Sequence, residues 1–192
     1  MRQIVLPTLL LALTVPAGTS LSSQTPAPKA APGFHRVDLK PAQGQALPYT
    51  IEVPADWSVR QIATAPGLWL GPADAAPPND PRLVWVRGSG VSLADPAAVV
   101  ANIRQNAAAQ KGWTAPLAEV REVGGVKGVL VRMDSGEGAA ARSTLTLKLP
   151  LEKAAVDFVC QGERKSFEQN LARCERVLLS VRPAAAGAPA KP

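Results

Sequence analysis

Residues 156–181, with the sequence VDFVCQGERKSFEQNLARCERVLLSV, indicate a strand that leads through a short polar turn into a helix. Val156, Phe158 and Cys160 occupy alternate positions, so they share one face of the strand. In the segment after the turn, Ser166 can cap a helix, and Gln169 follows at the spacing of a capping box. This strand–helix unit is the best-marked part of the chain, and the other segments can be arranged around it.

One face of the predicted helix is apolar and carries a cysteine. Its members recur at spacings of four, three and four residues and therefore lie along one side of a helix: Phe167, Leu171, Cys174 and Leu178. Cys160 and Cys174, the only two cysteines, thus lie on apolar faces that can pack together. A disulfide between them would stabilise the fold by roughly 3 kcal/mol in the chain-entropy model. The alternative is two buried free thiols, which behave as small hydrophobic side chains.

The N-terminal segment favours the disulfide, because it predicts export to an oxidising compartment. A short basic start is followed by an apolar run of about a dozen residues, too short for a membrane span of about 20, and by small residues suited to signal peptidase. We therefore predict a signal peptide at residues 1–17, a Pro/Ala/Ser-rich linker at 18–33, one domain at 34–182 and a disordered tail at 183–192. No cysteine lies near the cleavage region, so we expect a soluble periplasmic or extracellular protein, without an integral membrane span after cleavage, rather than a lipoprotein.

The charge of the predicted domain argues against nucleic acid as a partner. The formal net charge of the chain is +6, but Arg2, Lys29 and Lys191 lie outside the domain and all 15 acidic residues lie inside it. The domain therefore carries only +3, without the clustered basic stripe that binding to a phosphate backbone favours.

Alternation and turn signals predict an α+β fold with an antiparallel sheet. Gly124-Gly125 forms a two-residue hairpin turn between strands 118–123 and 126–133. The next strands, 143–149 and the one with Cys160, complete a meander of four C-terminal strands. Further strands are expected at 36–39, 49–53, 67–70 and 83–86, and Asp95-Pro96 begins a helix that ends near Lys111.

Two short signatures resemble the PsbP-like superfamily, which includes PsbP, the Mog proteins and many exported bacterial domains. Tyr49-x-Ile51-x-x-Pro54-x-x-Trp57 opens the domain, and Leu178-Leu-Ser-Val-Arg182 closes it after the strand–helix unit. The resemblance implies an antiparallel sheet sandwiched between helices and a non-enzymatic role in docking on, or assembling, another protein. The matching positions serve packing and turns, so no functional residue is carried over.

The sequence offers no catalytic, cofactor or metal-binding motif. His35 is the only histidine, and its place at the junction of linker and domain favours a surface or strand-edge position over catalysis. Asp74, Asn79 and Asp80 share a proline-rich loop and could supply oxygen ligands to calcium, but their spacing differs from an EF-hand and such residues are common in turns. We therefore predict no catalytic residue, no cofactor and no metal site.

Partner binding is the remaining class of site, and the tryptophans near loops are candidates for it. Trp69 and Asp80 are our candidates for partner binding, since tryptophan is enriched at binding hot spots. Trp57, also near a loop, could anchor a partner as well, Trp85 is expected in the core, and packing is the favoured role for each tryptophan taken individually. Arg164 and Lys165 precede the predicted helix and could attract an anion, although a solvated turn is the favoured explanation.

These observations support three hypotheses about function. The first is an exported, non-enzymatic binding or assembly module that docks on another envelope protein. The second is a domain that binds a small ligand or an envelope polymer in a pocket between sheet and helix. The third is a hydrolase with an unrecognised site, for which His35 is the obvious residue.

Overall fold

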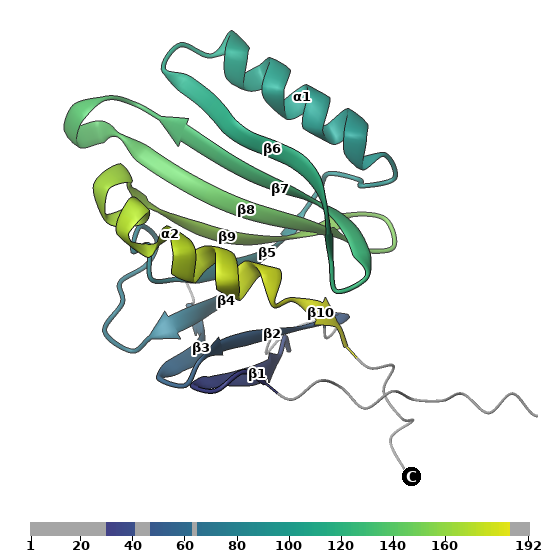
Figure 1. Cartoon of the computed structure of the whole chain (residues 1–192), viewed down its shortest axis with the longest axis vertical. Helices are drawn as coiled ribbons and strands as arrows, with labels where there is room; N and C mark the ends of the chain where they lie inside the picture. The colour runs from purple at the N-terminus through teal and green to yellow at the C-terminus, as the bar shows by residue number, and fades with distance from the viewer. Residues whose placement is uncertain (1–29, 41–46, 63–64, 185–192) are drawn as a thin grey trace, which may run out of the picture.

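A computed structural model of the chain describes residues 30–40, 47–62 and 65–184 (Figure 1). The predicted signal peptide, most of the predicted linker and all but the first two residues of the predicted tail lie outside the described residues. Among the described residues, no helix has the length and apolar character needed to cross a membrane.

Seven antiparallel strands form the large sheet, in the order β3-β4-β5-β9-β8-β7-β6. The strands are β3 (Trp57–Ile62), β4 (Ala65–Pro72), β5 (Val84–Ser89), β6 (Trp113–Val123), β7 (Val126–Ser135), β8 (Arg142–Pro150) and β9 (Ala155–Glu163). The predicted four-strand meander is β6 to β9, and it is confirmed. Gly124 and Gly125 form its first turn with φ values of 61° and 81°, which glycine adopts without steric cost.

A second sheet of three strands lies below the large one in Figure 1. Its order is β1 (Phe34–Asp38), β2 (Tyr49–Pro54) and β10 (Arg182–Pro183), so the two ends of the predicted domain meet across β2. The Ser180 hydroxyl fixes this junction, because it accepts a hydrogen bond from the Glu52 amide at 2.9 Å and donates to carbonyl oxygens.

Two α-helices pack on opposite faces of the large sheet. α1 (Pro96–Ala109) packs on β6 and β7, and the Asp95 carboxylate caps it by accepting a bond from the Ala98 amide. α2 (Arg164–Leu179) packs on β8 and β9 and also contacts β2 of the small sheet. A single 3-10 turn, η1 (Gly138–Ala140), lies between β7 and β8. The predicted α+β fold, with antiparallel sheets and helices on both faces, is confirmed.

The start of α2 differs from the prediction. The helix begins at Arg164 directly after β9, and Glu163 occupies the N-cap position without a side-chain cap. The Ser166 hydroxyl instead donates to the Glu163 carbonyl oxygen at 3.1 Å. Arg164 and Lys165 are therefore part of the first helical turn, and the Arg164 guanidinium points to the carbonyl oxygens of the loop after β7, at 3.5 Å.

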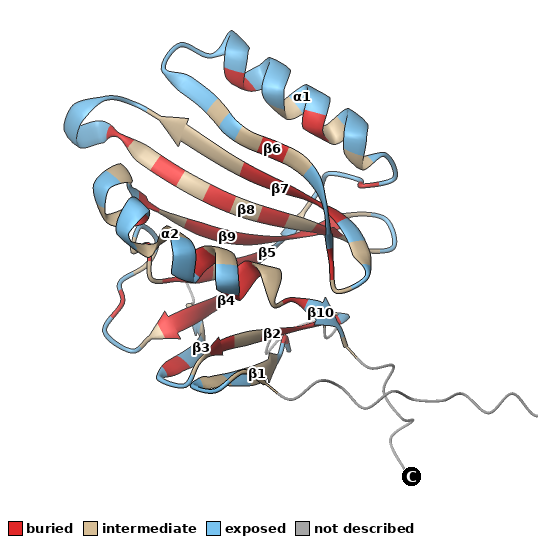
Figure 2. Cartoon of the chain, viewed as in Figure 1, coloured by how far each residue is buried: buried red, intermediate tan, exposed pale blue. Residues whose placement is uncertain are grey.

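The main core lies between the large sheet, α2 and the small sheet (Figure 2). Its members include the inward side chains of β8 and β9 and the apolar face of α2, as predicted: Leu145, Leu147, Leu149, Val156, Phe158, Cys160, Phe167, Cys174 and Leu178. A smaller core lies under α1, where Val100 packs with Val129 and Val131 of β7. Helix α1 thus lies over the β6–β7 end of this face of the large sheet, and the core beneath it extends to Ala155 of β9.

Cys160 of β9 and Cys174 of α2 face each other in the main core. Their Cα atoms are 6.3 Å apart, which is compatible with a disulfide, and both side chains are almost completely buried. The structure thus supports the geometry of the predicted pair, and oxidation of the two thiols stays a prediction.

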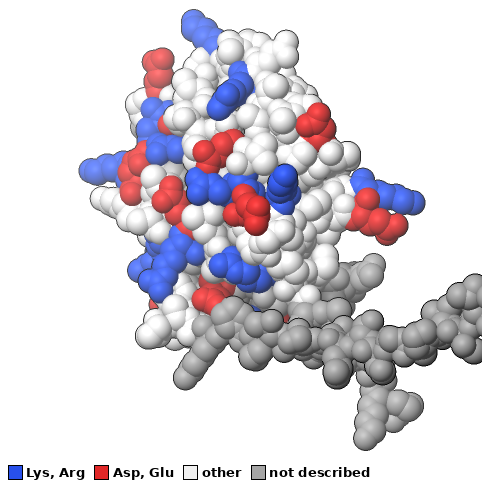
Figure 3. Space-filling model, turned by 45° about the vertical axis from the view of Figure 1, so that its right-hand side comes forward, with Lys and Arg blue, Asp and Glu red and all other residues white. Residues whose placement is uncertain are grey.

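Acidic and basic side chains are mixed on the face of the molecule in Figure 3, without a continuous field of one sign. This distribution agrees with the small net charge of the predicted domain. It gives no support to a nucleic-acid interface, which needs a basic patch.

Candidate functional site

The strand register places two rows of side chains side by side on the face of the large sheet that α1 covers in part. In the first row, Lys148 of β8 pairs with Asp157 of β9, and Asp157 pairs with Arg87 of β5. We call these three residues the charged row. In the second row, Trp85 of β5 pairs with Trp69 of β4, and we call these two the aromatic row.

Helix α1 leaves this sector of the sheet uncovered. It packs on β6 and β7. Val129 and Val131 of β7 extend the charged row and the aromatic row, and both are buried beneath the helix. Farther along the rows, Lys148 and Trp85 are half-buried and Arg87 is exposed. We call the part of this face formed by the two rows the open sector.

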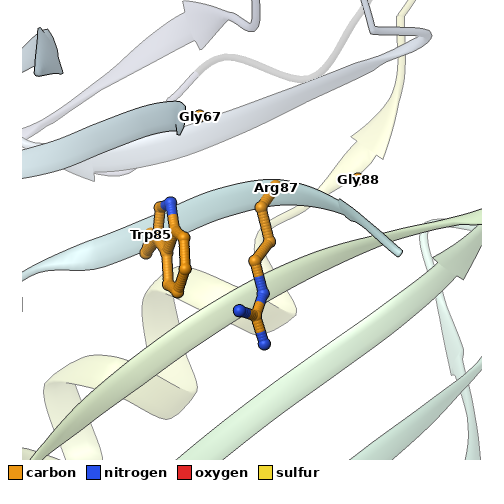
Figure 4. A pocket seen from close by; sticks show the side chains of 4 residues that line it. All are labelled: Gly67, Trp85, Arg87 and Gly88. Carbon is orange, nitrogen blue, oxygen red and sulfur yellow. The ribbon is translucent and has the colours of Figure 1, made fainter. Parts of the chain in front are cut away.

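The aromatic row is a rigid stack. The rings of Trp69 and Trp85 are 5.1 Å apart and nearly parallel, with an angle of 5° between their planes. The Arg87 guanidinium carbon lies 4.2 Å from the centre of the Trp85 ring, within the range of a cation–π contact. Figure 4 shows that Trp85 and Arg87 project to the same side of β5. Neither side chain is therefore free to rotate without losing a stacking contact.

The charged row contains a nearly buried carboxylate. The Asp157 side chain is only 5% exposed, and the Lys148 ammonium donates to both of its oxygens at 2.7 and 2.9 Å. Arg87 Nε lies 4.0 Å from the same carboxylate. Burial of a carboxylate is unfavourable unless hydrogen bonds and an opposite charge compensate for it. Lys148 provides both, and the row as a whole keeps one excess positive charge.

A small hollow of about 250 Å³ lies next to the aromatic row and is lined by Gly67, Trp85, Arg87 and Gly88 (Figure 4). Gly67 has a φ of 118°, and a Cβ atom at this position would lie 2.7 Å from the Trp85 indole nitrogen. A side chain at position 67 would therefore displace the tryptophan. At Gly88, by contrast, a Cβ atom would meet nothing within 4 Å.

The structure places the two predicted partner-binding residues in supporting positions. Trp69 is 1% exposed, so it presents no surface of its own and instead supports Trp85. Trp57 is also buried, as a packing role requires, and a partner-binding role for Trp69 stays a prediction. Sequence reasoning placed Trp85 in the core, yet this residue is half-buried and reaches the surface of the open sector.

Asp80 organises the loop between β4 and β5. Its carboxylate accepts bonds from the Arg82 amide at 2.9 Å and from the Arg82 guanidinium at 2.7 and 3.0 Å. Asp74 accepts from the same guanidinium at 2.7 Å. These bonds from Arg82 lower the pKa of both carboxyl groups below their ordinary value. The two acidic side chains named as calcium ligands thus hold an arginine, and a partner-binding role for Asp80 stays a prediction.

A wider hollow of about 440 Å³ separates this loop from the start of α2. Its lining mixes polar and apolar groups from the loop, the end of β9 and the start of α2: Ala76, Asn79, Asp80, Pro81, Arg82, Glu163, Ser166 and Asn170. Its position at the surface is consistent with a shallow binding site, but Asp80 and Arg82 in its lining are already paired with each other.

No reactive constellation is present among the described residues. His35 is exposed on β1, the edge strand of the small sheet, which confirms its predicted surface or strand-edge position. Within residues 30–40, 47–62 and 65–184, no three His, Cys, Asp or Glu side chains are grouped so that they could hold a metal ion.

Sequence reasoning missed the open sector because its residues are far apart in the chain. The sequence does show which side chains of a strand share a face: Lys148 alternates with inward leucines, and Asp157 alternates with Val156 and Phe158. What was missing was the register that aligns Lys148, Asp157 and Arg87 across three strands.

The fold is similar to the PsbP fold. The solution structure of cyanobacterial PsbP (CyanoP) from Synechocystis matches with a TM-score of 0.51 and 15% identity, over 85% of this chain and 98% of CyanoP. The crystal structure of LpqN, involved in cell envelope biogenesis of Mycobacterium tuberculosis, matches with a TM-score of 0.53 and 14% identity, over 79% and 92% of the two chains. At this identity the likeness concerns the fold alone. No family model and no curated protein matches the sequence.

Proposed function

We propose that this protein is an exported, non-enzymatic module of the cell envelope that docks on another envelope protein through the open sector. The observation that carries the proposal is the fixed pair of Trp85 and Arg87 on an uncovered part of the sheet. Tryptophan and arginine are the residue types most enriched at protein-binding hot spots.

The rigidity of the open sector supports a docking role. Trp69 holds Trp85 from one side, and Asp157 and Lys148 form an ion pair beside Arg87. Side chains that are already ordered lose little conformational entropy when a partner binds, which favours association.

The structural neighbours agree with this class of function without identifying the partner. CyanoP is a PsbP protein and LpqN is described as involved in cell envelope biogenesis, and neither description is that of an enzyme. Export of this chain rests on its N-terminal sequence and on the disulfide-compatible cysteine pair.

The docking proposal can be tested by photo-crosslinking in intact cells. A photoreactive amino acid replaces Gly88, where a side chain meets open space, and the matched control carries it at Arg173 on the exposed side of α2. We expect a saturable adduct with one envelope protein from position 88, and a lower yield when Trp85→Ala is added. Identical adducts from both positions, or none from position 88, would contradict docking at the open sector.

The second candidate function is binding of a small ligand or polymer in the 440 Å³ hollow beside α2. Its position between a loop and a helix is the observation in its favour. Thermal-shift screening with sugars, lipids, metals and peptides separates the two functions, since a ligand that binds the folded state raises Tm. A shift that Asp80→Ala removes and Trp85→Ala keeps would support this second function.

A further inference from the structure

The guanidinium of Arg87 is held in place, and among the described residues it makes no hydrogen bond. Its side chain is 44% exposed, and its Nε atom lies 4.0 Å from the Asp157 carboxylate, beyond hydrogen-bond distance. Within the described part of the chain, its contacts are this ion pair and the stacking on Trp85. The planar fork of N–H donors is therefore available to an incoming group.

The neighbouring charges leave Arg87 with an unbalanced positive charge. Both oxygens of Asp157 are already bound by Lys148, at 2.7 and 2.9 Å, so one carboxylate is shared by two cations. A carboxylate is the natural complement, because an arginine fork can donate two parallel hydrogen bonds to its two oxygens. The Trp85 ring beneath the guanidinium restrains it in one plane before any ligand arrives.

On its β4 side, the backbone next to Arg87 has no paired partner among the described residues. Among the described residues, the pairing of β4 with β5 ends at Val86, opposite Leu68, whereas β5 continues to Ser89 and pairs with β9 over that stretch. On the side of β5 that faces β4, residues 87–89 thus lie beyond the paired region, at the hollow lined by Gly67 and Gly88. An extended peptide can pair with such a strand edge and direct alternate side chains into adjacent pockets.

We propose that this hollow binds an acidic side chain of an extended segment of the partner protein, with its carboxylate on Arg87 and its backbone along residues 87–89. The inference rests on the proposed docking function and specifies the chemistry of the partner. Aliphatic atoms of the acidic side chain would lie against the exposed part of Trp85, and the carboxylate would neutralise the excess charge of the charged row.

The test is a titration of the purified protein with defined probes. An acetylated and amidated hexapeptide of alternating Thr and Glu is compared with its Thr/Gln counterpart, and acetate and inorganic phosphate serve as free anions. Tryptophan fluorescence and the NMR signal of the Trp85 indole report binding. We expect the Glu peptide to bind at millimolar concentration or below, and about tenfold more tightly than the Gln peptide, as loss of one charge-assisted hydrogen-bonded pair predicts.

Variants distinguish this site from a general attraction of anions. Arg87→Gln should weaken the Glu peptide about tenfold, Arg87→Lys should restore only part of the affinity because it lacks the fork, and Arg173→Gln, a matched loss of exposed charge on α2, should have no effect. Unchanged Tm values would show that the variants fold. The proposal is overturned if the Glu peptide does not bind, if the Gln peptide binds equally, if Arg87→Gln has no effect, or if free acetate or phosphate binds as tightly as the peptide.

The outcome can be separated from that of the docking proposal. If position 88 crosslinks to a partner in cells and Arg87→Gln leaves the yield unchanged, docking at the open sector stands and the acidic-segment inference fails. If position 88 gives no adduct and the peptide does not bind, both fail.

Discussion

The two faces of the large sheet are built from the same strands and differ in how they are covered. On the side of α2, Leu145, Leu147 and Leu149 of β8 are fully buried against the helix and the small sheet. On the other side of the same strand, Lys148 stays half-buried, because α1 stops at β6 and β7. One strand thus contributes to a closed core and to an open surface.

Adjacent residues of β9 illustrate the consequence of this difference in coverage. Phe158 is 0% exposed and packs edge-on against Tyr49, with ring centres 6.3 Å apart. Asp157 is buried almost as deeply, but on the open face, where Lys148 compensates its charge. The closed face is stabilised by apolar burial, and the open face keeps charges in place by pairing them. Substitutions on the two faces should therefore differ in size and in kind.

The largest effect is expected from a cavity on the closed face. Phe158→Ala should lower the free energy of unfolding by about 4 kcal/mol, since it removes a fully buried ring and leaves a cavity. Urea unfolding followed by circular dichroism measures this loss. The control is Thr146→Ala on the open face, which should cost less than about 1 kcal/mol. Equal losses would show that the two faces are equally closed.

The second effect concerns the cysteine pair, which ties α2 to the closed face. Reduction of the pair should lower the free energy of unfolding by about 3 kcal/mol in the chain-entropy model. The measurement is urea unfolding with and without reductant, and Cys160→Ala/Cys174→Ala is the control that should not respond to reductant. Alkylation of both cysteines in the intact, unreduced protein would show that the disulfide is absent.

A smaller effect is expected from the charged row of the open face. Lys148→Met keeps most of the side-chain volume but leaves the Asp157 carboxylate without its hydrogen-bonded cation, at a cost of about 2 kcal/mol. The residual contact with Arg87, at 4.0 Å, limits the loss.

A double-mutant cycle isolates the contribution of this pair. Lys148→Met combined with Asp157→Asn should cost less than the sum of the two single variants, with a coupling energy of about 1 kcal/mol or more. Additive losses would mean that the pair contributes no stability of its own and that the open face is stabilised only by packing.

The closed face was largely predictable from the sequence. Leu145, Leu147 and Leu149 alternate with polar residues, and Phe167, Cys174 and Leu178 recur at helical spacing, so local periodicity identified the core of β8 and α2. Strand β3 was missed, because no strand was expected between 53 and 67. The pattern of β3 is weak because it is an edge strand, where Ser58 and Val59 are both exposed.

The open face was not predictable in the same way. Its position depends on where α1 ends relative to β8, and its contents depend on a register across three strands, from Lys148 to Asp157 and Arg87. Neither property is encoded in a local pattern. Trp69 attracted attention as an exposed anchor because it lies near a loop, whereas the sheet register stacks it beneath Trp85.

The smallest expected effect lies in the loop between β4 and β5, and it depends on pH. Hydrogen bonds from the Arg82 side chain lower the pKa of Asp80 below its ordinary value of 3.8. A carboxyl group with a lower pKa in the folded state stabilises the protein above its unfolded pKa, and this contribution disappears as the pH falls through the folded pKa. At pH 7, Asp80→Asn should therefore cost less than about 1 kcal/mol, because solvent screens the pair.

Urea unfolding at pH 7 and at several values below pH 4 measures this difference. The difference in the free energy of unfolding between the natural protein and Asp80→Asn should narrow as the pH falls. The loss of stability from Phe158→Ala should persist, because apolar burial involves no proton. Asp74→Asn is the matched control: the Asp74 side chain is 72% exposed, so its removal should change stability less than that of Asp80. A difference in stability that stays constant down to the lowest pH would mean that Asp80 stabilises the loop through its hydrogen bonds with the backbone and not through its ion pair with Arg82.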